Sequence, residues 1–166
     1  MIGVLSLLQS EPFVQSVQVA TDKVPTIILY NERQIQDIRN YCFNRQDGSV
    51  FSCDKTFNLS SLFLTVTTYQ NKGLKWANDD KEEPTYPVFF GPLFLHGNSD
   101  TASYNVFFSH LAGLLMDSPN QQLRFGSDDE RAMRKSIMHC FPSASILSCT
   151  RHLKVYRYFI SYIIIL

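Results

Sequence analysis

Acidic residues are missing from the whole C-terminal end of this sequence, and charged residues are scarce throughout it. No Asp or Glu follows Glu130, and charged residues make up only 18% of the 166 residues. Fifteen Lys and Arg balance fifteen Asp and Glu, so the zero net charge excludes attraction to nucleic acid by the chain as a whole. The stretch after Glu130 is nevertheless basic, with Arg131, Arg134, Lys135, Arg151, Lys154 and Arg157. This basic region, 131–157, either faces phosphates or forms an ordinary solvated helix face.

Disulfides, a leader segment and a membrane span are not indicated either. Four scattered cysteines are too few for a disulfide scaffold, which favours a reducing, intracellular compartment. The apolar start, 1–8, has no basic residue and no small-residue cleavage site, so we predict no signal peptide. The apolar tail, 158–166, is shorter than the ~20 residues of a membrane span. We therefore predict no membrane partner and interpret the tail either as a cut-off core strand or helix or as read-through past a lost reading frame.

Several catalytic signatures are absent as well. The sequence has no glycine-rich phosphate loop, no Gly-x-Ser-x-Gly elbow and no paired Cys-x-x-Cys finger. What it does have is 45% hydrophobic and 13% aromatic residues, which excludes a disordered chain. Its length suits one domain with a sizeable core.

The hydrophobic pattern predicts three strands, then a helix, a strand, a helix and a strand. The strands are expected at 49–53, 62–69, 87–95, 123–127 and 145–149, and the helices at about 99–115, capped by Ser99 or Thr101, and 130–141. Gly91-Pro92 marks a bulge or an edge position in the third strand. This order predicts an α/β fold with a mixed, ribonuclease H-like sheet flanked by helices, incomplete at its C-terminus.

The remaining segments divide the chain around that core. Residues 1–45 form a lead-in with a short helix at 2–8, strands at 13–19 and 26–30, and a helix capped by Asn31. The core itself is expected over 46–157, with a surface loop at 71–84, and the apolar tail follows at 158–166.

Two aspartates follow apolar strands and are candidate metal ligands. Asp54 comes directly after 49–53, and Asp128 comes directly after 123–127. Carboxylates at the ends of neighbouring central strands can converge on a divalent cation, because hard ions such as Mg²⁺ prefer oxygen ligands. Two such ions can activate an attacking hydroxyl and stabilise the leaving oxygen of a phosphodiester. The alternative is that both aspartates simply cap turns or helices.

Four segments resemble blocks of a known protein family. The run CDKTFNL at 53–59, followed by FLTVTTY, resembles the first-aspartate block of Mutator-like element transposases. The strand PVFFGPL at 87–93 and the run FGSDDERA at 125–132 resemble the next strand and the second-aspartate block. The run FPSASILSCTRH at 141–152 is similar to the strand and Cys-x-x-His element that closes the block. The shared order extends over about residues 25–155.

The resemblance implies a ribonuclease H-like DDE transposase core that cleaves and joins DNA ends with Mg²⁺ or Mn²⁺. Asp54 and Asp128 would be the catalytic metal ligands, and a downstream Glu would be the third. No acidic residue follows Glu130, and Glu130 itself is expected on an outgoing helix that points it away. We therefore expect a C-terminally truncated transposase core that is inactive alone. The family places it in the nucleus, with DNA and transposase homo-oligomers as partners and the DNA-binding module elsewhere.

Cys149 and His152 form the Cys-x-x-His pair of that family, where it is structural or contacts DNA. Zinc is a possible cofactor, but a complete site needs four ligands and this pair supplies two. Nothing in the sequence places His139 and Cys140 on one face to complete it. The alternative is a buried strand-end thiol beside a helix-start imidazole.

Three other side chains have similarly open interpretations. Cys53 is expected to be a core thiol, because alternation turns it away from the side of Asp54. His96 either approaches the metal edge or is a satisfied surface group, and Trp76 either stacks on a base or packs within its loop.

Two further functional classes stay open. A non-enzymatic, domesticated or remnant module would keep the fold in order to bind DNA or a protein partner, without metal dependence. An exonuclease on the same fold would carry a Glu two residues after the first Asp, where this chain has Thr56. Binding of Mg²⁺ or Mn²⁺ through Asp54 separates the transposase fragment from the non-enzymatic module.

Overall fold

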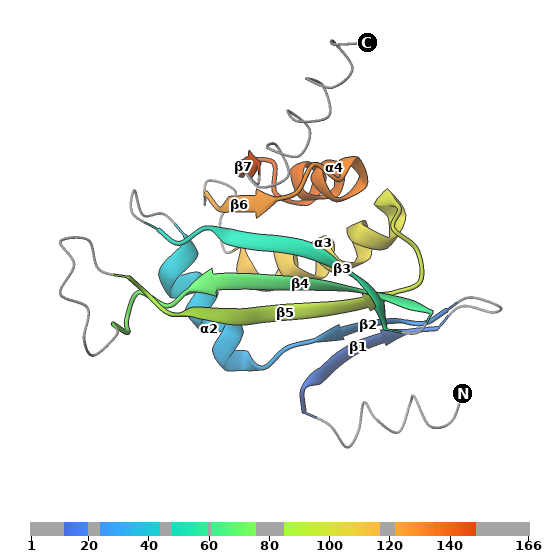
Figure 1. The fold of residues 1–166 in the computed structure, drawn as a ribbon, viewed down its shortest axis with the longest axis horizontal. Coiled ribbons are helices and arrows are strands. Elements are labelled where there is room, and N and C mark those ends of the chain that lie inside the picture. The colour runs from blue at the N-terminus through green and yellow to red at the C-terminus, as the bar shows by residue number, and fades with distance from the viewer. Residues whose placement is uncertain are drawn as a thin grey trace, which may run out of the picture.

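A computed structural model describes residues 12–19, 24–43, 48–59, 61–75, 85–116 and 122–148. Within these residues seven strands form one sheet in the order β1-β2-β5-β4-β3-β6-β7 (Figure 1). The strands are β1 (Val14–Gln18), β2 (Thr26–Leu29), β3 (Phe51–Leu59), β4 (Leu62–Gln70), β5 (Val88–His96), β6 (Arg124–Ser127) and β7 (Ser145–Ser148). The helices are α2 (Glu32–Cys42), α3 (Thr101–Leu115) and α4 (Arg131–Cys140). The chain is thus an α/β protein with a mixed sheet, as predicted.

The sheet has an antiparallel half and a parallel half. β3, β4 and β5 form an antiparallel meander, and β2 and β1 extend it beyond β5 with antiparallel pairing. α3 then leads to β6, which pairs in parallel with β3, and α4 leads to β7, which pairs in parallel with β6. Parallel neighbours need such crossover helices, because a tight turn cannot return the chain to the same end of the sheet. The predicted succession of strands and helices in the core is confirmed.

The described helices pack on the same face of the sheet. The Phe107 ring of α3 stacks on Phe94 of β5 with 5.0 Å between ring centroids, and Phe108 meets Phe125 of β6 edge-on at 5.9 Å. Phe141, which follows α4, packs on the same Phe125 ring at 5.1 Å. All of these rings are nearly or completely buried. The aromatic core therefore lies between the helices and this face.

The opposite face has no such cover from the described helices. Along β4, Thr65, Thr67 and Tyr69 are buried, whereas the alternating residues Leu64 and Val66 are only partly buried. Because successive side chains of a strand point to opposite faces, this alternation separates a helix-facing side from an open side.

Side-chain caps explain where two helices begin. Asn31 caps α2, because its side chain accepts from the Gln34 backbone N–H at 2.9 Å while Gln34 returns a bond to the Asn31 N–H. The predicted cap at Asn31 is confirmed. The predicted cap of α3 at Ser99 or Thr101 is wrong, because Asp100 has the extended backbone and accepts from the Ser103 N–H at 2.7 Å.

Two further details differ from the sequence prediction. β3 continues to Leu59, so Asp54 lies within the strand and not at its end, because the long hairpin partner β4 keeps pairing beyond it. Gly91-Pro92 does coincide with an irregularity in the β4–β5 register, but β5 is an interior strand because β2 pairs with its far side. The bulge interpretation is confirmed and the edge interpretation is wrong.

Some predicted segments lie outside the described residues. These are the expected helix at 2–8, the loop part at 76–84 with Trp76, the Cys149 and His152 pair, and the apolar tail at 158–166. Within the described part of the chain, no helix has the length and apolar character needed to cross a membrane.

Candidate functional site

Asp54 lies in the middle of β3 and faces the open side of the sheet. Its neighbours Cys53 and Lys55 are buried or half-buried on the helix-facing side, whereas Asp54 is exposed. Asp54 makes no hydrogen bond or ion pair with any other described residue. Among the described residues, its carboxylate is thus exposed and bound to no other side chain.

Asp128 directly follows β6, the parallel neighbour of β3. The register pairs Cys53 with Ser127, so Asp54 and Asp128 are the next residues along two adjacent strands. Neighbouring strands lie about 4.8 Å apart, which brings the two backbones within reach of a shared ligand. The Asp128 Oδ1 atom accepts a hydrogen bond from the Glu130 N–H at 3.2 Å, which fixes the turn into α4.

Both aspartates line the same hollow on the open face, with a volume of about 830 Å³. Its walls are mostly apolar and come from the five adjacent strands β5, β4, β3, β6 and β7. Ser52, Cys53, Asp54, Thr56, Leu64, Val66, Thr68, Phe90, Leu93, Gly126, Ser127, Asp128, Leu147 and Ser148 line it. Asp54 and Asp128 are the acidic side chains among them.

The pKa of the buried Cys53 thiol is affected by both aspartates. Burial raises the pKa of Cys53 above its ordinary value, and the nearby carboxylates of Asp128 and Asp54 raise it further. A thiol with a raised pKa stays protonated and inert at neutral pH. The expectation that Cys53 is a core thiol is confirmed, because its side chain is 2% exposed.

The two aspartates fit part of a divalent metal site. Mg²⁺ binds through one or two carboxylates together with water and substrate oxygens, and it demands near-octahedral geometry. Asp54 and Asp128 offer two such carboxylates from a rigid sheet. A third acidic ligand is not present in the described part of the chain, where no three His, Cys, Asp or Glu residues gather closely enough to hold a metal ion.

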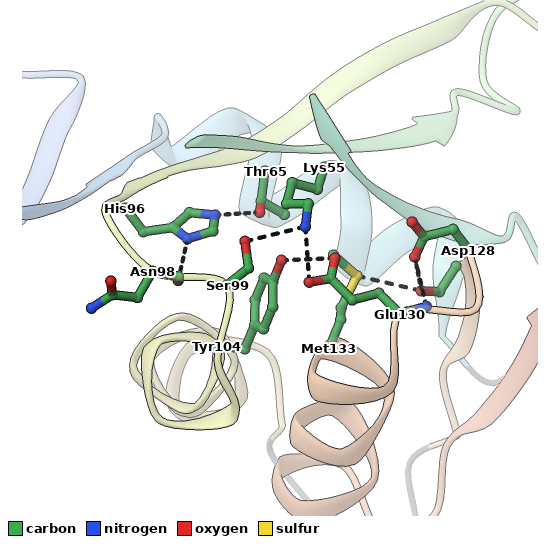
Figure 2. A network of polar contacts seen from close by, with 10 residues as sticks. Lys55, Thr65, His96, Asn98, Ser99, Tyr104, Asp128, Glu130 and Met133 are labelled. Atoms are coloured by element: carbon green, nitrogen blue, oxygen red, sulfur yellow. Dashed lines mark hydrogen bonds and ion pairs between the residues drawn. The ribbon is translucent and has the colours of Figure 1, made fainter. Parts of the chain in front are cut away.

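Glu130 does not supply that third ligand. Its Oε1 lies 3.0 Å from the Lys55 Nζ, and its Oε2 accepts from the Tyr104 hydroxyl at 3.0 Å (Figure 2). Both partners belong to the helix-facing side of the sheet. The expected orientation away from the metal side is thus found, although Glu130 precedes α4 instead of lying within it. These partners also explain why its side chain does not cap the helix.

His96 belongs to the core and not to the metal edge. It is fully buried, with Nε2 bonded to the Thr65 hydroxyl at 2.9 Å and Nδ1 to the Asn98 carbonyl at 2.8 Å (Figure 2). Burial lowers the pKa of His96, with the Asn98 contact partly opposing the shift. Both alternatives weighed for His96, a metal-edge residue and a surface group, are therefore wrong.

The basic residues of α4 differ in their availability. Arg131 and Lys135 are exposed, whereas Arg134 donates to the Ser148 hydroxyl at 2.9 Å and lies 3.8 Å from Asp129. Phosphate contact by this helix would therefore rest on Arg131 and Lys135.

His139 and Cys140 do not form a zinc-binding pair within the described structure. His139 is exposed, whereas the half-buried Cys140 lies 3.3 Å from the Ser109 hydroxyl of α3. Cys149 and His152, the other half of a possible zinc site, lie outside the described residues. Zinc binding by that pair stays a prediction.

Sequence reasoning missed Lys55 and Tyr104. In the sequence, Lys55 is only one residue of the CDKTFNL run, and Tyr104 is only one residue of the helix expected at about 99–115. A lysine directly after the first aspartate, together with a glutamate two residues after the second, could have suggested an ion pair. Lys55 meets Glu130 only because β3 and β6 are parallel neighbours in the sheet, and a single sequence does not reveal that pairing.

Comparison of the chain with protein families, with characterised proteins and with solved structures finds no match. Function is therefore inferred from the site and from the order of its strands.

Proposed function

We propose that this chain is part of the catalytic core of a DDE-type, Mutator-like transposase, and that Asp54 and Asp128 bind Mg²⁺ or Mn²⁺. The observation that carries the proposal is the placement of one carboxylate within β3 and of the other directly after β6, the parallel neighbour of β3, beside one hollow. A capping role accounts less well for Asp54, because it lies inside a strand and contacts no described partner.

The sheet order supports a ribonuclease H-like fold for this core. An antiparallel meander of three strands, with two further strands added in parallel on the side of its first strand, gives the order β5-β4-β3-β6-β7. In this arrangement the first strand of the meander is central, and the next parallel strand ends beside it. Asp54 lies within the first of these strands, and Asp128 directly follows the second. Strand topology alone does not define a function, so the proposal depends on the carboxylates.

The chemistry implied is cleavage and joining of DNA phosphodiester bonds. When bound, divalent ions supply charge neutralisation and activation of the attacking and leaving oxygens. The chain's own part is to hold two ligands on a rigid sheet, while the exposed Arg131 and Lys135 lie on the helix that follows Asp128. Because a third acidic ligand is needed, we propose that this chain does not carry out strand transfer alone. We place the protein in the nucleus, with DNA and further transposase copies as partners.

Metal binding tests the proposal. Mn²⁺ binding is measured by calorimetry and by the loss of the free-ion electron paramagnetic resonance signal. The wild-type chain should bind Mn²⁺, and both Asp54→Asn and Asp128→Asn should abolish saturable binding. Asp129→Asn is the matched control, because it removes the same charge from an adjacent residue outside the hollow. Equal binding by wild type and Asp54→Asn would refute the proposal.

A non-enzymatic module is the second candidate, and the apolar hollow is the observation in its favour. Phe90 and Leu147 line the hollow, and these two residues are 66% and 47% exposed, respectively. Large exposed apolar side chains around a concavity are typical of interaction sites. This candidate predicts that no property of the chain responds to Mg²⁺ or Mn²⁺, so the same titrations separate the two functions.

A further inference from the structure

Lys55 and Glu130 form a mostly buried ion pair on the helix-facing side of the sheet. The Lys55 Nζ lies 3.0 Å from the Glu130 Oε1, and the two side chains are only 17% and 16% exposed. Lys55 also donates to the Ser99 hydroxyl at 3.1 Å, and Tyr104 donates to the second Glu130 oxygen at 3.0 Å. Figure 2 shows these groups converging between the sheet and the helices. We call this pair the Lys55–Glu130 bridge.

The two ends of the bridge lie next to the proposed metal ligands in the chain. Lys55 directly follows Asp54 in β3, and strand alternation sends the two side chains to opposite faces of the sheet. Glu130 comes two residues after Asp128, and its N–H donates to the Asp128 Oδ1 at 3.2 Å. The Glu130 side chain thus links the segment after β6 to β3, and the Glu130 backbone N–H holds the Asp128 carboxylate.

The pairing of β3 with β6 does not fix the position of Asp128 relative to Asp54. The paired register of β3 and β6 ends at Cys53 and Ser127, one residue before each aspartate. Asp128 lies outside β6 altogether, so no ladder bond fixes it relative to β3. Among the described residues, the Lys55–Glu130 bridge links β3 to the segment that follows β6 beyond this point.

We propose that Lys55 and Glu130 are positioning residues that hold Asp54 and Asp128 at the spacing a divalent ion needs. The inference rests on the proposed metal-binding function. Mg²⁺ and Mn²⁺ sites depend on ligand geometry, and residues that orient the ligands without touching the metal change its affinity about 10- to 100-fold when removed. Tyr104 supports the bridge by fixing the second oxygen of Glu130.

A purely electrostatic role and a positioning role of Lys55 predict opposite changes in Mn²⁺ affinity for Lys55→Met. Lys55→Met removes a positive charge near the site, so a purely electrostatic effect would tighten Mn²⁺ binding. A positioning role predicts weaker binding, by about tenfold or more. Glu130→Gln should weaken binding as well, but there both effects act in the same direction. Lys55→Met is therefore the decisive variant.

The experiment measures Mn²⁺ affinity and thermal unfolding of the whole chain for each variant. The charge-reversed double variant Lys55→Glu/Glu130→Lys should recover part of the affinity lost in Lys55→Met, because it restores an ion pair across the same gap. Should Lys55→Met fail to fold, Tyr104→Phe provides the second test, with a severalfold loss expected. Tyr69→Phe is its matched control. Tyr69 also donates to a buried carboxylate, that of Asp37 on α2, and neither of these residues lines the hollow or contacts the Lys55–Glu130 bridge.

The outcomes separate this inference from the proposed function. Mn²⁺ binding that depends on Asp54 but is unchanged or tightened in Lys55→Met would overturn the positioning role and leave the metal site standing. Equal losses in Tyr104→Phe and Tyr69→Phe would overturn it too, because the effect would then be a general loss of stability. Absence of Asp54-dependent binding in the wild-type chain would overturn both proposals.

Discussion

Replacing Phe125 with alanine should remove a central support of the fold. Phe125 lies on β6, is completely buried, and contacts the rings of Phe51, Phe108 and Phe141 at centroid distances of 5.5, 5.9 and 5.1 Å. Those rings come from β3, α3 and the end of α4. A cavity at this point would therefore open between the sheet and both crossover helices.

The expected cost follows from that environment. Buried Phe to Ala substitutions cost about 3–5 kcal/mol, and the cost is highest where the surroundings cannot collapse into the cavity. β6 is paired on both sides, with β3 and β7, so its backbone cannot move inward. We expect a loss of about 4 kcal/mol in the free energy of unfolding. For a chain of this length that lowers the midpoint of thermal unfolding by about 8–16 °C.

Urea unfolding followed by far-ultraviolet circular dichroism measures this cost, with Phe90→Ala as the matched control. Phe90 is 66% exposed on β5, so the same chemical change there should alter stability by less than about 0.5 kcal/mol. A Phe125→Ala protein that loses no more stability than Phe90→Ala would refute the assignment of Phe125 to the centre of the core.

Three other perturbations have defined outcomes. Mn²⁺ at about 100 times its Kd should raise the free energy of unfolding by about 2.7 kcal/mol in wild type and in Asp129→Asn, but not in Asp54→Asn, as denaturant titrations with and without the ion would show. Asn31→Ala removes the capping acceptor of α2 and should cost about 1 kcal/mol in urea unfolding, whereas a value near zero would contradict the capping role. Burial lowers the pKa of His96 and of His110, so the unfolded chain binds more protons below its ordinary histidine pKa of about 6.5. Stability contributed by these neutral imidazoles should be present above that pH and fall as the pH drops below it, and a denaturant series at several pH values that shows the reverse slope would refute it.

Much of the fold follows from local patterns in the sequence. The run LFLTVTTY predicts β4 because β-branched and aromatic residues fit a pleated strand, and β4 indeed occupies Leu62–Gln70. The Asn31 cap predicts the start of α2 because its side chain satisfies a local backbone N–H. Both features depend on residues only a few positions apart.

Features that depend on distant partners escaped prediction. The length of β3 is set by its antiparallel partner β4, so the strand continues past Asp54 where its own pattern had suggested an end. The environment of His96 depends on Thr65 of another strand and on the helix that covers it. The Lys55–Glu130 bridge joins residues 75 positions apart. A single sequence does not reveal which of many distant polar residues will meet.

The two sides of the sheet restrict where the third acidic ligand of the proposed metal site can lie. On the helix-facing side Glu130 is already bound by Lys55 and Tyr104, and the aromatic core fills the space around it. A third carboxylate must therefore approach Asp54 and Asp128 from the open face. The rest of the hollow is largely apolar, so an element that brings the carboxylate would also cover exposed apolar surface and gain stability from doing so. Completion of the metal site and burial of the hollow should consequently occur together, and Mn²⁺ affinity should rise in any assembly that shields the hollow from water.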